Sequence, residues 1–282
     1  MNLGLAVSAA TRAGVADSAV LLAAAATAGV TARLIDWRST GWGWADAVLL
    51  HTPWDYTADP QAFAAWLTSV SSRAPLFNPR ASIARNMHKS YLLDLVEEGV
   101  PLPRTRLLHS GQVVDDGELG TTFGTSPVVV KPAVGAGGRH VHRLRRVADL
   151  SACPLVGAGG RPLEDIVVQE FVPSIETAGE NSLVVIAGEP SHLIRKVPAA
   201  GQFRVQASYG GTEHRVEMDD VAHRVAQAVR PRVAGLAYAR VDYVLDEEGA
   251  PLVMELELTE PDLFLRHFPG AARTLIEHVA GN

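Results

Sequence analysis

Residues 240–261 read RVDYVLDEEGAPLVMELELTEP, which places two strand-like runs on either side of a short polar turn. Side chains two apart on a strand share a face, so Arg240 and Asp242 lie together, as do Glu255 and Glu257. A hairpin that turns at DEEGA would gather three carboxylates and one guanidinium on one face. Carboxylates packed this closely repel each other unless a cation lies between them. The face is therefore either open to water or a cation site, and its hard oxygen ligands suit Mg²⁺.

The bulk composition excludes several classes of protein. The chain has 282 residues, a net charge of −6 and one cysteine, Cys153, so neither an internal disulfide nor a cysteine-based zinc cluster is possible. A negative net charge gives no electrostatic reason to expect a nucleic-acid partner. The apolar run at 19–28 is shorter than the roughly 20 residues that span a bilayer. We expect a cytoplasmic enzyme with no nucleic-acid or membrane partner.

The first quarter of the chain alternates between strand and helix patterns. We expect a parallel α/β domain over residues 1–77, because this alternation is typical of a parallel sheet. Ligand-facing loops should follow the carboxyl ends of its strands, at 8–11 and 51–56 (HTPWDY). The predicted strands are 3–7, 31–36 and 47–50, and the predicted helices are 16–28 and 60–72.

The alternation of strand and helix patterns ends at residue 78. Two further lobes are expected, over 78–172 and 173–282. The first would carry a glycine-rich loop and the second the acidic hairpin. Short helices are expected around Lys89, up to Gly99, and a longer helix over 219–234. The predicted strands are 128–131, 140–144, 166–171, 182–187, 192–197, 238–245 and 251–258.

The segment VVVKPAVGAGGRHV places Lys131 at a strand end, just before Gly135, Gly137 and Gly138. Glycines let backbone N–H groups approach phosphate oxygens, and the lysine adds a positive charge. The P-loop pattern is absent, and no helix follows as a dinucleotide fingerprint requires. Taken alone, the loop fits either a phosphate-binding loop or an ordinary turn.

Five segments in order resemble the ATP-grasp superfamily, in particular prokaryotic glutathione synthetase and its RimK-like relatives. They are NMHKSYLLDLVEEGVPLPRT, VVVKPAVGAGG, QEFVPSIETAGEN, IRKVPAAGQFRVQASYGG and RVDYVL with VMELELTEP. Within the superfamily, PWDY, GENSL with SHLIRK, and MELELTEP are similar to the cyclo-ligases of D-cycloserine biosynthesis. The resemblance implies an ATP-grasp fold preceded by a small parallel α/β domain. Members of the family often form dimers or tetramers, so a homo-oligomer is one possible state of this chain.

The resemblance also implies roles for individual residues. Lys89 and Lys131 would hold the phosphates of ATP, beneath a flexible loop formed by Gly135, Gly137 and Gly138. Gln169, Glu170, Phe171 and Val172 would contact adenine, and Glu180 the ribose. Asp242, Glu255 and Glu257 would hold Mg²⁺. Arg240 and Lys196 would act in catalysis with Lys131, and the expected substrate residues are Trp54, Asp55, Arg195, Arg204 and Glu260.

Two departures from the family bear on the substrate. Ser182 stands where glutathione synthetase has an arginine near the ribose, which argues against glutathione precursors. Glu260 replaces a small polar residue and either holds a substrate ammonium group or is a solvated turn acid. The expected activity is ATP-dependent ligation of a carboxylate, through an acylphosphate, to an amine. An intramolecular cyclo-ligase, a phosphotransferase and a catalytically silent ATP-binding module stay open as alternatives.

Overall fold

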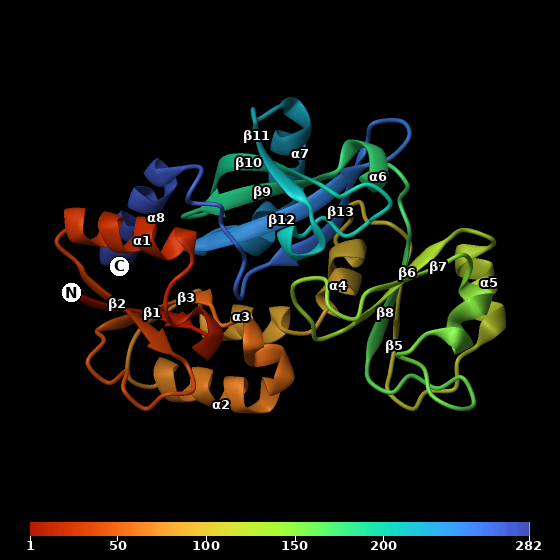
Figure 1. The fold of residues 1–282 in the computed structure, drawn as a ribbon, viewed down its shortest axis with the longest axis horizontal. Helices are drawn as coiled ribbons and strands as arrows, with labels where there is room; N and C mark the ends of the chain where they lie inside the picture. Colours follow the sequence, from red (N-terminus) through yellow and green to blue (C-terminus); the bar gives the residue numbers. More distant parts are fainter. Residues whose placement is uncertain (282) are drawn as a thin grey trace.

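The computed structural model describes residues 1–281 and arranges them around three β-sheets (Figure 1). Their strand orders are β2-β1-β3-β4, β5-β8-β6-β7 and β11-β10-β9-β12-β13. The strands are β1 Asn2–Val7, β2 Thr31–Asp36, β3 Ala47–Thr52, β4 Leu76–Phe77, β5 Thr105–Leu108, β6 Val128–Pro132, β7 His142–Leu144, β8 Ile166–Glu170, β9 Glu180–Ile186, β10 Glu189–Val197, β11 Thr212–Val216, β12 Tyr238–Leu245 and β13 Pro251–Glu257. The α-helices are α1 Ala16–Thr27, α2 Pro60–Ser71, α3 Arg80–Asn86, α4 Tyr91–Glu97, α5 Asp116–Phe123, α6 Ile175–Ala178, α7 Asp220–Val233 and α8 Pro269–Gly281. Short 3-10 helices are η1 Ala9–Thr11, η2 Trp54–Ala58, η3 Val147–Ala152 and η4 Ala207–Tyr209.

The first sheet is parallel throughout, as the alternation of strands and helices predicts. Helix α2 begins where the Asp59 carboxylate accepts a hydrogen bond from Ala62 N at 3.0 Å. It buries Phe63, Leu67 and Val70, whose spacing places them on one helix face. The carboxyl end of β3 leads directly into η2, so that η2 lies at the edge of the sheet where ligands are expected.

The hairpin of β12 and β13 forms with the predicted register in the five-stranded antiparallel sheet. Asp242 lies opposite Glu255, and Arg240 lies opposite Glu257. An irregularity follows Asp242, so that Tyr243 pairs with Val253. The four side chains therefore occupy one face, and helix α7 covers the opposite face of the sheet with an apolar stripe that includes Val225 and Val229.

The remaining sheet is antiparallel and carries the glycine-rich loop between β6 and β7. Three predicted strand limits differ here. The strand expected over 128–131 runs on to Pro132. The strand expected over 140–144 begins only at His142, because His140 has a positive φ of 57° that a strand cannot contain. The strand expected over 166–171 ends at Glu170.

Packing ties the sheets together. Helix α4 contributes Leu92 and Leu95 to the core of the five-stranded sheet. Helix α8, at the end of the chain, packs against α1 of the first sheet, and Figure 1 shows the two helices side by side. Asn78, immediately after the first sheet, is fully buried against β12 and the end of β13. Among the described residues, no helix is both long and apolar enough to cross a membrane.

Candidate active site

A cavity of about 700 Å³ lies where the three sheets meet. Residues from η2, the start of α4, the glycine-rich loop, β8, β10 and the β12–β13 hairpin line it. The sequence contains three lysines, and all three line this cavity: Lys89, Lys131 and Lys196. Each of them is less than a tenth exposed. Positive charge is therefore concentrated in a cavity large enough for a nucleotide and a small second ligand.

Two of the lysines meet at Glu255. Lys131 Nζ lies 2.9 Å from Glu255 Oε1 and Lys89 Nζ lies 3.7 Å from the same atom. Burial alone would raise the pKa of Glu255, but the two lysines outweigh it and lower the pKa to about 2. Lys89 Nζ also donates to the carbonyl of Gly135 at 2.8 Å. The two lysines predicted to bind phosphate therefore lie together under the glycine-rich loop.

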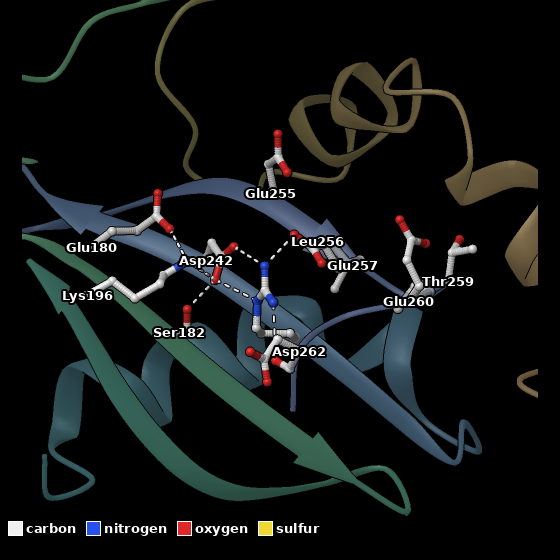
Figure 2. Close-up of polar contacts among 12 residues, drawn as sticks. Glu180, Ser182, Lys196, Asp242, Glu255, Leu256, Glu257, Thr259, Glu260 and Asp262 are labelled. Atoms are coloured by element: carbon white, nitrogen blue, oxygen red, sulfur yellow. Dashed lines mark hydrogen bonds and ion pairs between the residues drawn. The ribbon is translucent and has the colours of Figure 1, made fainter. Parts of the chain in front are cut away.

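Arg240 forms the centre of a second charged cluster. Figure 2 labels Asp242, Glu257 and Lys196, which belong to this cluster. The Nε and Nη2 atoms of Arg240 donate to the two oxygens of Asp242 at 3.0 and 2.9 Å, and Nη2 also contacts Glu257. Lys196 pairs with Glu180 and lies 3.3 Å from Asp242 Oδ1, which also accepts from Ser182. Burial opposes ionisation of Asp242, but Arg240 and Lys196 hold its pKa well below the usual value.

The three acids predicted to bind metal do not form a ready cluster. Within residues 1–281, no three His, Cys, Asp or Glu side chains converge as metal ligands. Asp242 and Glu257 turn to Arg240, whereas Glu255 turns to the lysines. Their hard oxygen atoms still line one cavity, and Mg²⁺ usually takes one or two carboxylates together with substrate phosphates. The donor set therefore fits Mg²⁺ held jointly with a nucleotide.

One end of the cavity is apolar. Phe171, Val172, Ile175 and Val205 form a buried cluster there, against which Met254 packs. A flat base ring fits such a cluster, since burial of aromatic area is favourable. Gln169 also lines the cavity, and its Oε1 atom accepts from Lys131 Nζ at 3.3 Å.

The opposite end is acidic. Glu260 is 8% exposed, and among residues 1–281 no basic side chain lies within ion-pair distance of it. Burial, followed by the nearby Glu257, raises the pKa of Glu260 to about 8. The pKa of Glu257 is itself raised to about 7, chiefly by burial. Tyr56 hydrogen bonds to Glu260, and Trp54 Nε1 donates to the Glu260 carbonyl at 3.1 Å. This end can accept a cationic group.

Three predicted site residues do not point their side chains into the cavity. Asp55 accepts hydrogen bonds from Trp37 Nε1 at 2.7 Å and Arg38 Nε at 3.2 Å, on the other side of η2. Arg195 donates to Asn181 at 3.1 Å, because strand alternation sends it to the face opposite Lys196. Glu170 pairs with Arg104, and this ion pair lowers the pKa of Glu170.

The other predicted residues line the cavity, together with several that sequence reasoning missed. Arg204 lies there, with its guanidinium 3.7 Å from the ring centroid of Tyr209. Tyr209 and Gln206 follow in the same quoted segment, and Tyr56 lies two positions after Trp54. The closeness of these three residues in sequence to predicted site residues is the feature that could have identified them. The cavity-lining residues predicted from sequence are Trp54, Lys89, Lys131, Gly135, Gly137, Gly138, Gln169, Phe171, Val172, Glu180, Lys196, Arg204, Arg240, Asp242, Glu255, Glu257 and Glu260.

Comparison with known proteins identifies the family. The ATP-grasp domain of prokaryotic glutathione synthetase matches residues 118–261, which is half of the chain. The chain belongs to this ATP-grasp family. It is an ATP-dependent ligase that forms C–N bonds. Residues 3–78 match a second family, the N-terminal domain of D-cycloserine synthetase DcsG.

Individual relatives of this ATP-grasp ligase agree with the family. The cycloserine biosynthesis protein DcsG of Streptomyces lavendulae is 29% identical, over 88% of each chain. The glutathione synthetase of Vibrio parahaemolyticus is 26% identical, but the match spans 48% of this chain and 42% of that protein. The crystal structure of D-cycloserine synthetase DcsG superposes with a TM-score of 0.85 at 26% identity, covering 100% and 99% of the two chains. A D-alanine–D-alanine ligase from Bacillus anthracis, in complex with ATP, shares the fold with a TM-score of 0.69 at 18% identity, covering 100% and 96%.

Proposed function

We propose that this ligase activates the carboxylate of a small amino acid derivative and joins it to an amine. The observation that carries the proposal is Glu260, a buried acid without a basic partner at the end of the cavity away from the apolar cluster. An ammonium group would supply the missing cation, and it would let Glu260 ionise. Relatives in the family that act on small amino-acid substrates support the same substrate class.

The charged residues suit the first chemical step. The substrate carboxylate attacks the γ-phosphate of ATP, which forms an acylphosphate and releases ADP. Two anions approach each other in this step, so positive charge must lie around the reacting oxygens. Lys89 and Lys131 would hold the phosphates, and Asp242, Glu255 and Glu257 would hold Mg²⁺. When bound, Mg²⁺ neutralises part of the phosphate charge.

The second step is attack of the amine on the acyl carbon, which forms the amide and releases phosphate. Arg240 lines the same cavity and would stabilise the oxyanion of the tetrahedral intermediate. Asp242 fixes the guanidinium through two hydrogen bonds, so Arg240 needs no reorganisation during the reaction. The glycine-rich loop would exclude water that hydrolyses the acylphosphate.

Ring closure within one substrate molecule is the second candidate. The match of residues 3–78 to the N-terminal domain of D-cycloserine synthetase favours it. That relative aligns with 88% of this chain, whereas the glutathione synthetases align with 48% to 68% of it. A cyclising substrate would carry both the carboxylate and the nucleophilic nitrogen.

ADP and phosphate release with Mg²⁺ and ATP should be measured across D- and L-amino acids, O-substituted serines and simple amines. Mass spectrometry of the products separates the two candidates. Ring closure yields a product lighter than its single substrate by one water, whether or not an amine is added. Intermolecular ligation needs the amine and adds its mass less one water. If ADP forms without any amide, the ligase proposal for these substrates is wrong.

A further inference from the structure

The glycine-rich loop touches two different parts of the protein. On one side, the Tyr209 hydroxyl donates to the Gly138 carbonyl at 3.2 Å. A Cβ atom on Gly138 would lie 2.7 Å from Gln206 Oε1, so the loop packs closely here. On the other side, Arg139 Nη2 donates to the Trp54 carbonyl at 3.1 Å and to Thr57 Oγ1 at 3.2 Å. Arg139 therefore connects the loop to η2 of the first domain.

The segment that Arg139 reaches is itself fixed. The Asp55 carboxylate accepts hydrogen bonds from Trp37 and Arg38. The indole of Trp54 extends the other way and donates to the carbonyl of Glu260 at 3.1 Å. Trp54 thus contacts both segments. Its carbonyl accepts from the glycine-rich loop, and its indole donates to the turn at the acidic end.

We propose that Arg139 is a positioning residue that couples closure of the glycine-rich loop to assembly of the acidic end of the cavity. The coupling runs from Arg139 to Trp54 and on to Glu260. It rests on the proposed function in one respect, the assignment of the acidic end to the substrate. With the coupling intact, the loop closes over the phosphates only when η2 and the Glu260 turn stand in their binding arrangement.

The contacts of Arg139 suit reversible closure of the glycine-rich loop. The side chain is exposed, and its acceptors are a carbonyl and a hydroxyl rather than a carboxylate. Each such bond contributes only modestly to stability, because water competes for the same groups. Product release needs the loop to open again, and weak contacts permit it. Arg143, four residues on, instead pairs with the Glu176 carboxylate of α6 at 2.7 Å.

Hydrogen–deuterium exchange on the full chain tests the coupling without a known substrate. The probe is a non-hydrolysable ATP analogue with Mg²⁺, and the two segments followed are 135–142 and 54–59. In the wild type, we expect the analogue to slow exchange in both segments. In Arg139→Ala, the loop should still gain protection, whereas the gain in 54–59 should fall roughly three- to tenfold, as expected for the loss of one or two hydrogen bonds.

Two further variants sharpen the test. Thr57→Val removes one acceptor and should lower the protection of 54–59 part of the way, with no added effect in the Arg139→Ala background. Arg146→Ala removes an exposed arginine that pairs locally with Asp149 and should match the wild type.

Equal protection of 54–59 in the wild type and Arg139→Ala would overturn the coupling while leaving the ligase proposal intact. Protection of the loop alone in the wild type would do the same. If the analogue protects neither segment, both the coupling and the assignment of the cavity to ATP are wrong.

Discussion

Lys131 Nζ lies 2.9 Å from Glu255 Oε1, although 124 positions separate the two residues in the chain. Lys131 lies in β6 of one sheet and Glu255 in β13 of another, so the pair spans the cavity. Each group compensates the other's buried charge. A nucleotide phosphate and a divalent cation would compete for the same two partners, the phosphate for the lysine and the cation for the acid.

Replacing Lys131 with alanine should abolish most ATP turnover. Loss of a charge-stabilising donor in an active site costs roughly 100- to 1,000-fold in rate. The fold should survive, because Lys89 still lies 3.7 Å from Glu255 and keeps that acid paired. ADP release and the thermal midpoint should be measured together. Full turnover in a folded variant would exclude Lys131 from phosphate binding.

Replacing Glu255 with glutamine should lower the affinity for Mg²⁺ without changing the size of the side chain. We expect half-saturation by Mg²⁺ to move up roughly 100-fold or more, because loss of an outer-shell partner of a metal ligand already costs roughly 10- to 100-fold in affinity. Titration of ADP release with Mg²⁺ measures the shift. Glu247→Gln, in the exposed turn of the same hairpin, is the matched control. An unchanged half-saturation in Glu255→Gln would show that this carboxylate serves only to pair the lysines.

The hairpin shows what local pattern can predict. Strict alternation and the polar DEEGA turn gave both strands nearly to the residue, and they placed Arg240, Asp242, Glu255 and Glu257 on one face. The same rule also separates Arg195 from Lys196, because neighbours on a strand face opposite ways. Lys196 lines the cavity and Arg195 does not, as this alternation requires.

Other features depend on contacts between distant segments. Strand β11 (TEHRV) is largely polar, since it lies at the edge of its sheet, and it was not predicted. Nothing local shows that Asp55 turns back to Trp37 and Arg38 instead of facing the cavity. The same applies to Glu260, whose raised pKa comes from its burial in the folded protein.

Replacing Asn78 with alanine should destabilise the whole protein. Its amide nitrogen donates to the carbonyls of Tyr238 and Leu258 at 2.8 and 2.9 Å, and its oxygen accepts from Ala237 N at 2.8 Å. The variant leaves these buried backbone groups unpaired, at about 1–3 kcal/mol for each group. Urea denaturation measures the loss. Gln61→Ala, which truncates an exposed amide on α2, should change the free energy of unfolding by less than about 0.5 kcal/mol. A comparably small change in Asn78→Ala would contradict the bridging role.

The stability of the protein should depend on pH through Glu260. Burial raises the pKa of this carboxyl from an ordinary value of 4.5 to about 8. Between those two values the native state binds more protons than the unfolded state, so the free energy of unfolding must fall as pH rises. Each unit of difference corresponds to about 1.4 kcal/mol. Glu257, with its pKa raised to about 7, adds to the same slope.

Glu260→Gln removes the titrating group, and we expect a shallower loss of stability between pH 5 and pH 8 than in the wild type. Denaturation at several pH values measures both slopes, with Glu247→Gln as the exposed control. An amino-bearing substrate should also bind the wild type more tightly as pH rises toward 8, because its ammonium group pairs with the ionised acid. The glutamine variant should lose that dependence. Parallel stability curves for the wild type and Glu260→Gln would contradict the raised pKa of Glu260. Equal affinity of both proteins for the amino-bearing substrate at every pH would overturn the ammonium assignment.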